Sequence, residues 1–160
     1  MKIFGKTLSE YVSFCKWILV LIAAVGVVRL TLSLAGLPNS EVKWFSVTAM
    51  AIVGMVYCAV IVHTSGFGSY KHLLPLLVLQ SLVGNGIVIG GILLAMATGT
   101  DNIYSAPEYS GGVDGKTWMH VGGHALLGIV LGPLVSWLVG SGLMLIAKKV
   151  SPASVPVGQH

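Results

Sequence analysis

Four long apolar runs, separated by short polar segments, dominate the pattern of this 160-residue chain. They cover approximately residues 17–37, 44–63, 72–97 and 118–147. Each run is about as long as the ~20 residues that a helix needs to cross ~30 Å of hydrocarbon. The polar segment 98–117 is longer than a simple connection requires. This pattern predicts an all-α integral membrane protein: a four-transmembrane-helix antiparallel bundle with one long outer loop.

The same runs leave no room for a separate soluble domain. Residues 1–150 are predicted to form one membrane domain, in which residues 1–16 lie at the membrane surface as a helical lead-in. Residues 151–160 hold two prolines and no core-forming side chains, which predicts a disordered cytoplasmic tail.

Composition and charge support this interpretation and add an orientation. Hydrophobic residues make up 55% of the chain and charged residues 9%, against about one quarter charged in soluble domains. The basic residues are scattered beside apolar runs, which is typical of topology determinants and argues against nucleic acid as a partner. A cytoplasmic N-terminus places six basic residues inside and three outside, so both termini are predicted to be cytoplasmic in a plasma (inner) membrane. The inner set is Lys2, Lys6, Lys16, Lys71, Lys148 and Lys149, and the outer set is Arg29, Lys43 and Lys116.

Small residues recur every fourth position in the last two runs. In lipid, this spacing lets helices approach closely, because dispersion and backbone contact replace the hydrophobic drive of water. The 21 glycines among 160 residues exceed the ~7% average. We therefore expect packing faces that serve a homo-oligomer or a larger membrane complex within the lipid bilayer. The predicted packing residues are Gly86, Gly90, Gly128, Gly132, Ser136 and Gly140.

Two histidines at the start of the fourth run are candidate metal ligands. His120 and His124 lie one helical turn apart, and Glu108 or Asp114 could complete the shell of a divalent metal. The positive end of the helix dipole and the lack of a further ligand at fixed spacing oppose a metal. Haem is less favoured still, because the first three runs offer no histidine at the same depth. Hydrogen bonding to the outer loop is the preferred interpretation of both histidines.

Arg29 lies near the outer end of the first run. A charge at the middle of a membrane span costs about 2.5–3.5 kcal/mol, and a position nearer the surface lowers this cost. Topology brings Arg29 to the depth of the outer loop, where it could hold an anion or lipid headgroup, or pair with a loop carboxylate. In the third run, Gln80 and Asn85 are expected to form hydrogen bonds between helices. The predicted outer polar site therefore consists of Arg29, Asp101, Glu108, Asp114, His120 and His124.

The chain contains no pattern typical of an enzyme, such as a nucleophile with its base or a phosphate-binding glycine loop. It also has no acidic residue within an apolar run and no repeated half that would indicate a transporter. We predict a small binding or assembly protein, a scaffold or accessory subunit, that acts through its glycine-rich helix faces and outer polar site. The alternatives are a metal- or haem-binding membrane protein that uses His120 and His124, and a small transporter or channel that works as a homo-oligomer.

Overall fold

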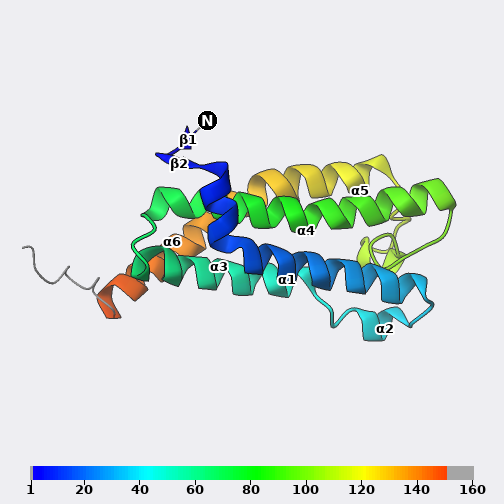
Figure 1. The fold of residues 1–160 in the computed structure, drawn as a ribbon. Coiled ribbons are helices and arrows are strands. Elements are labelled where there is room, and N and C mark those ends of the chain that lie inside the picture. Colours follow the sequence, from blue (N-terminus) through cyan, green and yellow to red (C-terminus); the bar gives the residue numbers. More distant parts are fainter. Residues whose placement is uncertain (1, 151–160) are drawn as a thin grey trace, which may run out of the picture.

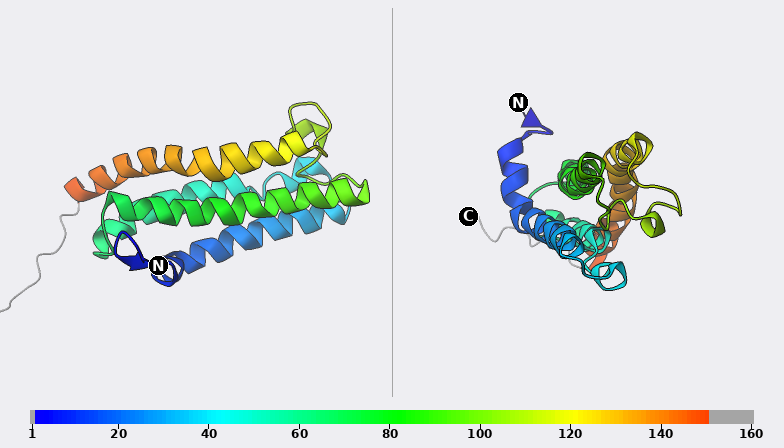
Figure 2. Two further views of the ribbon diagram at one scale, coloured as in Figure 1. Left: turned by 90° about the horizontal axis from the view of Figure 1, so that it is seen from above. Right: turned by 90° about the vertical axis from the view of Figure 1, so that its right-hand side faces the viewer.

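The computed structural model describes residues 2–150, which form four long helical stretches lying side by side (Figures 1 and 2). All four are long and apolar enough to cross a membrane, so the predicted number of apolar helices is confirmed. The predicted tail, residues 151–160, lies outside the described residues. The long elements are α1 (Leu8–Leu34), α3 (Val47–Thr64), α4 (Tyr70–Thr98) and a last stretch made of α5 (Trp118–Gly123), the π-helix η2 (His124–Leu131) and α6 (Gly132–Val150).

The described part of the chain begins with a short hairpin that the hydrophobic pattern does not predict. Strands β1 (Lys2–Ile3) and β2 (Lys6–Thr7) pair in antiparallel fashion. Phe4 and Gly5 at the turn have φ values of 51° and 89°. Two consecutive left-handed residues form the turn that matches the twist of a tight hairpin.

Helix α1 starts earlier than the predicted first run, residues 17–37. The Thr7 side chain accepts a hydrogen bond from the Glu10 backbone N–H, and the Glu10 carboxylate accepts one from the Thr7 N–H at 2.7 Å. This reciprocal capping box satisfies two backbone donors and starts the helix at Leu8. The predicted helical lead-in, residues 1–16, is therefore helical only from Leu8 on, where it is continuous with α1, and it is wrong for the hairpin residues 2–7. Helix α1 bends after its first turns (Figure 1).

Two connections meet at one end of the helices, called the loop end from here on (Figure 1). One contains α2 (Asn39–Val42) and the other, residues 99–117, contains the 3-10 helix η1 (Pro107–Tyr109). The Asn39 amide donates to the Glu108 carboxylate at 2.7 Å, and the Tyr109 hydroxyl donates to the Asn39 carbonyl at 3.1 Å. These contacts hold the two connections together.

The loop formed by residues 99–117 folds back over the helices. Its segment 102–106 is buried, whereas most residues from 107 to 114 are exposed. The Asn102 amide donates to the Gly91 carbonyl at 2.7 Å, and the Tyr104 hydroxyl donates to the Gly26 carbonyl at 2.9 Å. The loop is thus anchored to both α4 and α1.

Helix α4 is the central element, because it packs against α1, α3, η2 and α6. Its Leu73, Leu76 and Leu77 belong to a buried cluster near the hairpin, and its Ile92 belongs to a second buried cluster near the loop end. The last stretch packs unevenly: α6 contacts both α3 and α4, whereas α5 packs on α4 and η2 packs chiefly on α4. Space therefore remains between α3 and the first half of the last stretch.

Two of the predicted packing glycines lie where helices approach closely. A Cβ atom added to Gly140 would lie 3.0 Å from the Leu73 side chain, and one added to Gly128 would overlap the Asn85 amide. These glycines serve contacts within the chain.

The other predicted packing residues have different surroundings. A Cβ atom on Gly86 or Gly90 would meet nothing within 4 Å, so this face of α4 is uncovered in the single chain. Gly132 and Ser136 line a cavity. Packing between chains through any of these residues stays a prediction.

Candidate functional site

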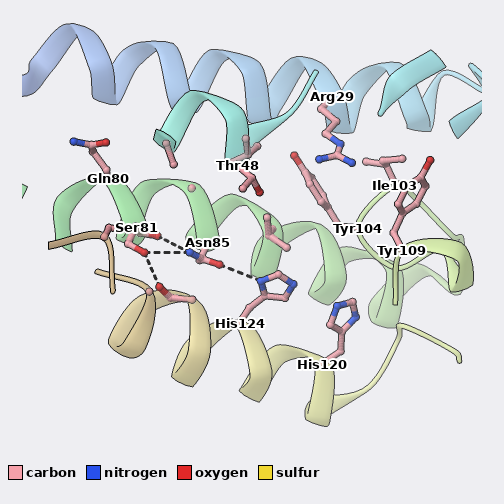
Figure 3. A pocket seen from close by; sticks show the side chains of 17 residues that line it. Arg29, Thr48, Gln80, Ser81, Asn85, Ile103, Tyr104, Tyr109, His120 and His124 are labelled. Atoms are coloured by element: carbon pink, nitrogen blue, oxygen red, sulfur yellow. Dashed lines mark hydrogen bonds between the residues drawn. The ribbon is translucent and has the colours of Figure 1, made fainter. Parts of the chain in front are cut away.

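A cavity of about 410 Å³ lies between the helices toward the loop end (Figure 3). Its size is within the ~300–1,000 Å³ of small-molecule sites. It is called the Arg29 cavity here, because Arg29 is the only residue in its wall with a permanent charge. The polar residues of the wall are Arg29, Thr48, Gln80, Ser81, Asn85, Tyr104, Tyr109, His120, His124 and Ser136.

The cavity separates the two buried clusters. Along α4, the first cluster uses residues 73–77, the cavity wall uses residues 80–88, and the second cluster includes residue 92. The helices are therefore well packed on the hairpin side and on the loop side of the cavity. This packing fixes the positions of the side chains that line the cavity.

A proline explains why one carbonyl group of the π-helix beside the cavity needs a donor from another helix. In a π-helix each carbonyl accepts from the N–H five residues later, as the Leu127 carbonyl does from Gly132. The next carbonyl in this series, that of Gly128, would need an N–H from Pro133, which has none. The Ser81 hydroxyl supplies the missing donor, at 2.6 Å from the Gly128 oxygen.

This hydrogen bond starts a chain that reaches His124 (Figure 3). The Asn85 Nδ2 donates to the Ser81 carbonyl at 3.2 Å and to its hydroxyl oxygen at 3.3 Å, so the Asn85 Oδ1 must point the other way. Oδ1 lies 3.0 Å from the Nδ1 of His124 and can only accept. His124 Nδ1 therefore carries a proton, and in the neutral ring Nε2 is a hydrogen-bond acceptor.

The second histidine is oriented in the same way by the loop. Thr117 caps α5 by accepting a hydrogen bond from the His120 backbone N–H at 3.2 Å. The His120 Nδ1 lies 3.0 Å from the Gly115 carbonyl, which can only accept. The two imidazole rings have centroids 5.1 Å apart. In neutral rings the Nε2 atoms of His120 and His124, two residues that line the cavity, are therefore hydrogen-bond acceptors.

Arg29 carries a charge that no acidic side chain in residues 2–150 balances within ion-pair distance. Its Nε is buried and lacks a hydrogen-bond partner within the same residues. Its guanidinium carbon lies 5.3 Å from the Tyr104 ring centre and 6.0 Å from that of Tyr109. Such cation–π contacts contribute about 0.5–2 kcal/mol. Burial raises the pKa of Tyr104 to about 12, so its hydroxyl stays neutral beside the arginine.

The loop acids predicted to join Arg29 have other partners. The Lys116 ammonium lies 2.6 Å from the Asp101 carboxylate and 3.2 Å from that of Asp114. A hydrogen bond from the Lys116 backbone N–H lowers the pKa of Asp114, and the hydrogen bond from Asn39 lowers that of Glu108. None of the three lines the Arg29 cavity. Of the predicted outer polar site, the structure brings together Arg29, His120 and His124.

No group of three or more His, Cys, Asp or Glu side chains able to hold a metal ion occurs in the described residues 2–150. Glu108 and Asp114, which were expected to complete a metal shell, hydrogen-bond Asn39 and Lys116 instead. The positive charge of Arg29 in the same cavity also opposes a bound cation. The structure therefore offers two imidazoles without the other predicted ligands.

The two predicted polar residues of α4 both line the cavity and both contact another helix. The Gln80 amide donates to the Cys58 sulfur at 3.3 Å, and Asn85 contacts His124. Sequence reasoning missed Ser81 and Tyr104. A proline inside a long apolar run was the available signal for Ser81, because its missing N–H leaves a carbonyl that needs a polar partner.

Comparison of the chain with protein-family models, curated proteins and solved structures finds no match.

The Ser81 hydrogen bond gives a first testable prediction. Ser81→Ala should lower the free energy of unfolding by about 1 kcal/mol, because the Gly128 carbonyl loses its only side-chain donor. In a Pro133→Ala background the cost should shrink, since the restored N–H can reach a carbonyl of the preceding turn. Unfolding by denaturing detergent measures both, and Ser136→Ala, in the same cavity wall, is the control. Equal costs in the two backgrounds would contradict the proline explanation.

The orientation of Asn85 gives a second prediction. In ¹⁵N NMR spectra of histidine-labelled protein, neutral His124 should carry its proton on Nδ1, because Asn85 Oδ1 accepts it. Asn85→Ala should release His124 so that the Nε2–H tautomer is also observed. His120, held by the Gly115 carbonyl, should not change and provides the internal control. A proton on Nε2 of His124 in the unaltered protein would contradict the assignment.

Proposed function

We propose that this chain is an integral membrane protein of four spanning helices, arranged as an antiparallel bundle, that binds an anionic group in the Arg29 cavity. The membrane part rests on four apolar helices and on their largely exposed apolar surfaces. Trp17, Trp44 and Trp118 are 73%, 80% and 72% exposed, and aromatic residues of this kind favour the membrane–water interface.

The proposed orientation puts the loop end outside the plasma membrane and both termini in the cytoplasm. Arg29, Lys43 and Lys116 belong to the loop end, and the larger set of six lysines to the opposite end. Basic residues favour the cytoplasmic side, which supports this orientation.

Cysteine labelling tests the orientation. Ser40→Cys, exposed at the loop end, should react with a membrane-impermeant maleimide on intact cells, whereas Lys71→Cys, exposed at the other end, should react only after permeabilisation. The native Cys15 and Cys58 are buried and should give little background. Labelling of position 71 alone on intact cells would reverse the topology.

The binding role rests on one observation: the unbalanced charge of Arg29. A charge within a membrane span costs about 2.5–3.5 kcal/mol on the insertion scale, and two cation–π contacts offset only part of this. The loop acids that could neutralise Arg29 are engaged by Lys116 and Asn39. An anionic ligand would supply the missing charge and the missing acceptor for Nε.

The two histidines add a second feature to the proposed ligand. With both Nδ1 protons engaged, the Nε2 atoms of His120 and His124 can accept hydrogen bonds from a ligand hydroxyl or amide. They present no donor to it while they are neutral. The histidines thus permit a hydrogen-bond donor on the ligand, whereas the anionic group is the feature that Arg29 requires.

The remaining functional predictions stay open. An assembly role has the uncovered Gly86 and Gly90 face in its favour, and transport by a homo-oligomer stays a prediction. A metal at His120 and His124 stays an alternative for which the other expected ligands are engaged elsewhere.

Thermal unfolding in a neutral detergent tests anion binding. At constant ionic strength, acetate or phosphate in place of chloride should raise the melting temperature of the unaltered protein, because a ligand stabilises the state that binds it. Arg29→Gln should abolish this rise, since a hydrogen-bonded charge contributes about 1.5–3 kcal/mol to binding. The same variant should match or exceed the ligand-free stability of the unaltered protein, because it removes an unbalanced charge.

Lys43→Gln is the matched control, because Lys43 carries the same charge at the loop end and lies beside Trp44, outside the cavity. It should leave the anion effect intact. An anion effect that survives Arg29→Gln, or is absent from the unaltered protein, would remove the proposal.

A further inference from the structure

The Arg29 cavity is long as well as charged at one end. His120, His124, Gly128, Gly132 and Ser136 line it at every fourth position of the last helical stretch. From His124 to Ser136 this track extends roughly 18 Å at ~1.5 Å per residue. One acyl chain of a membrane leaflet occupies about half of the ~30 Å hydrocarbon thickness, so the track has the length of one such chain.

The inner part of the cavity offers no free donor among its hydrogen-bonded polar groups. The Ser81 hydroxyl donates to the Gly128 carbonyl, and the Asn85 amide donates to Ser81. The Gln80 amide donates to Cys58. Val47, Ala51 and Gly84 add small or apolar wall between them. The same wall contains the hydroxyl groups of Thr48 and Ser136 and the buried Oε1 of Gln80, which has no hydrogen-bond partner in the described residues. The cavity thus passes from a charged end at Arg29 to an uncharged inner part.

The cavity also has a side from which a lipid could enter. Thr48 lines it and is exposed, and η2, across from Thr48, packs chiefly on α4. The outward residues of η2, including Leu127 and Val130, are exposed apolar side chains that would face lipid. A ligand dissolved in the membrane could therefore reach the cavity without crossing water.

We infer that the ligand is a single-chain amphiphile of the fatty-acid class, whose carboxylate contacts Arg29 and whose chain lies along the track from His124 to Ser136. This inference rests on the proposed anion site and adds the chemistry of the rest of the ligand. Small residues along the track leave space for one narrow chain beside Arg29.

A photoreactive probe tests the inference directly. The protein is placed in nanodiscs of neutral phosphatidylcholine with a palmitate analogue that carries a diazirine in mid-chain, and labelled residues are mapped by mass spectrometry. Labelling should fall on track residues between Gly128 and Ser136, and palmitate should compete with it whereas hexadecanol should not. Arg29→Gln should reduce it about tenfold or more, because the charged hydrogen bond is lost.

Two further variants separate the chain site from the anion site. Ser136→Leu should block the inner track and reduce labelling, while the stabilisation by acetate persists. Gly142→Leu, on the same helix with open space around its Cβ, should have no effect. If Ser136→Leu fails to fold, Ala51→Leu blocks the track from the opposite wall.

The outcomes distinguish this inference from the function on which it rests. Labelling confined to lipid-facing residues such as Leu134 and Leu138, with the acetate effect intact, would overturn the chain site and leave the anion site standing. Equal competition by phosphatidylglycerol would also overturn it, because a two-chain lipid would then be the occupant. Loss of both the acetate effect and Arg29-dependent labelling would remove the anion site as well.

Discussion

The carbonyl oxygen of Gly128 cannot receive the hydrogen bond of a π-helix, because the donor five residues later would be Pro133, and the geometry of the cavity depends on how this need is met. Ser81 meets it from the neighbouring helix. In an apolar environment an unsatisfied carbonyl is costly, so the contact fixes η2 against α4 at this depth. Asn85 then has one orientation, and His124 one protonation pattern. The missing N–H of Pro133 is thus linked, through Ser81 and Asn85, to the orientation of the His124 ring.

The hollow around these groups lowers stability and indicates selection for something other than packing. Buried clusters lie on both sides of it, so the chain has the residues needed to pack helices tightly. Arg29 in its wall adds an unbalanced charge where a neutral side chain would cost less. Strained or costly features in natural proteins concentrate at functional sites, because selection retains them only where they contribute to function. The hollow and the charge occur together, which strengthens the case that one ligand accounts for both.

Sequence predicted the four helices well because long apolar runs in a charge-poor chain have few alternatives. It could not predict the π-helix, since in a uniformly apolar run a change of helical period leaves no trace in the hydrophobic pattern. The hairpin at Phe4 and Gly5 was missed for a related reason: its two-residue strands are too short to show alternation. The sequence placed Arg29, His120 and His124 at a common depth but did not determine that they lie side by side. The sequence did not predict the partners of the loop acids either, because lateral position depends on which helices are neighbours.

The loop acids show how the fold keeps the cavity positive. Asp101 and Asp114 lie close to Arg29 in the predicted topology, yet both pair with Lys116 within their own loop. Glu108 is held by Asn39 across the two connections. Exposed ion pairs of this kind contribute little to stability, so their main effect is to engage the acidic side chains of the loop. These contacts engage the three acids of the loop, and no carboxylate lines the cavity with Arg29. The loop formed by residues 99–117 therefore contacts Arg29 through its tyrosines, while its acidic side chains pair with Lys116 and Asn39 and not with Arg29.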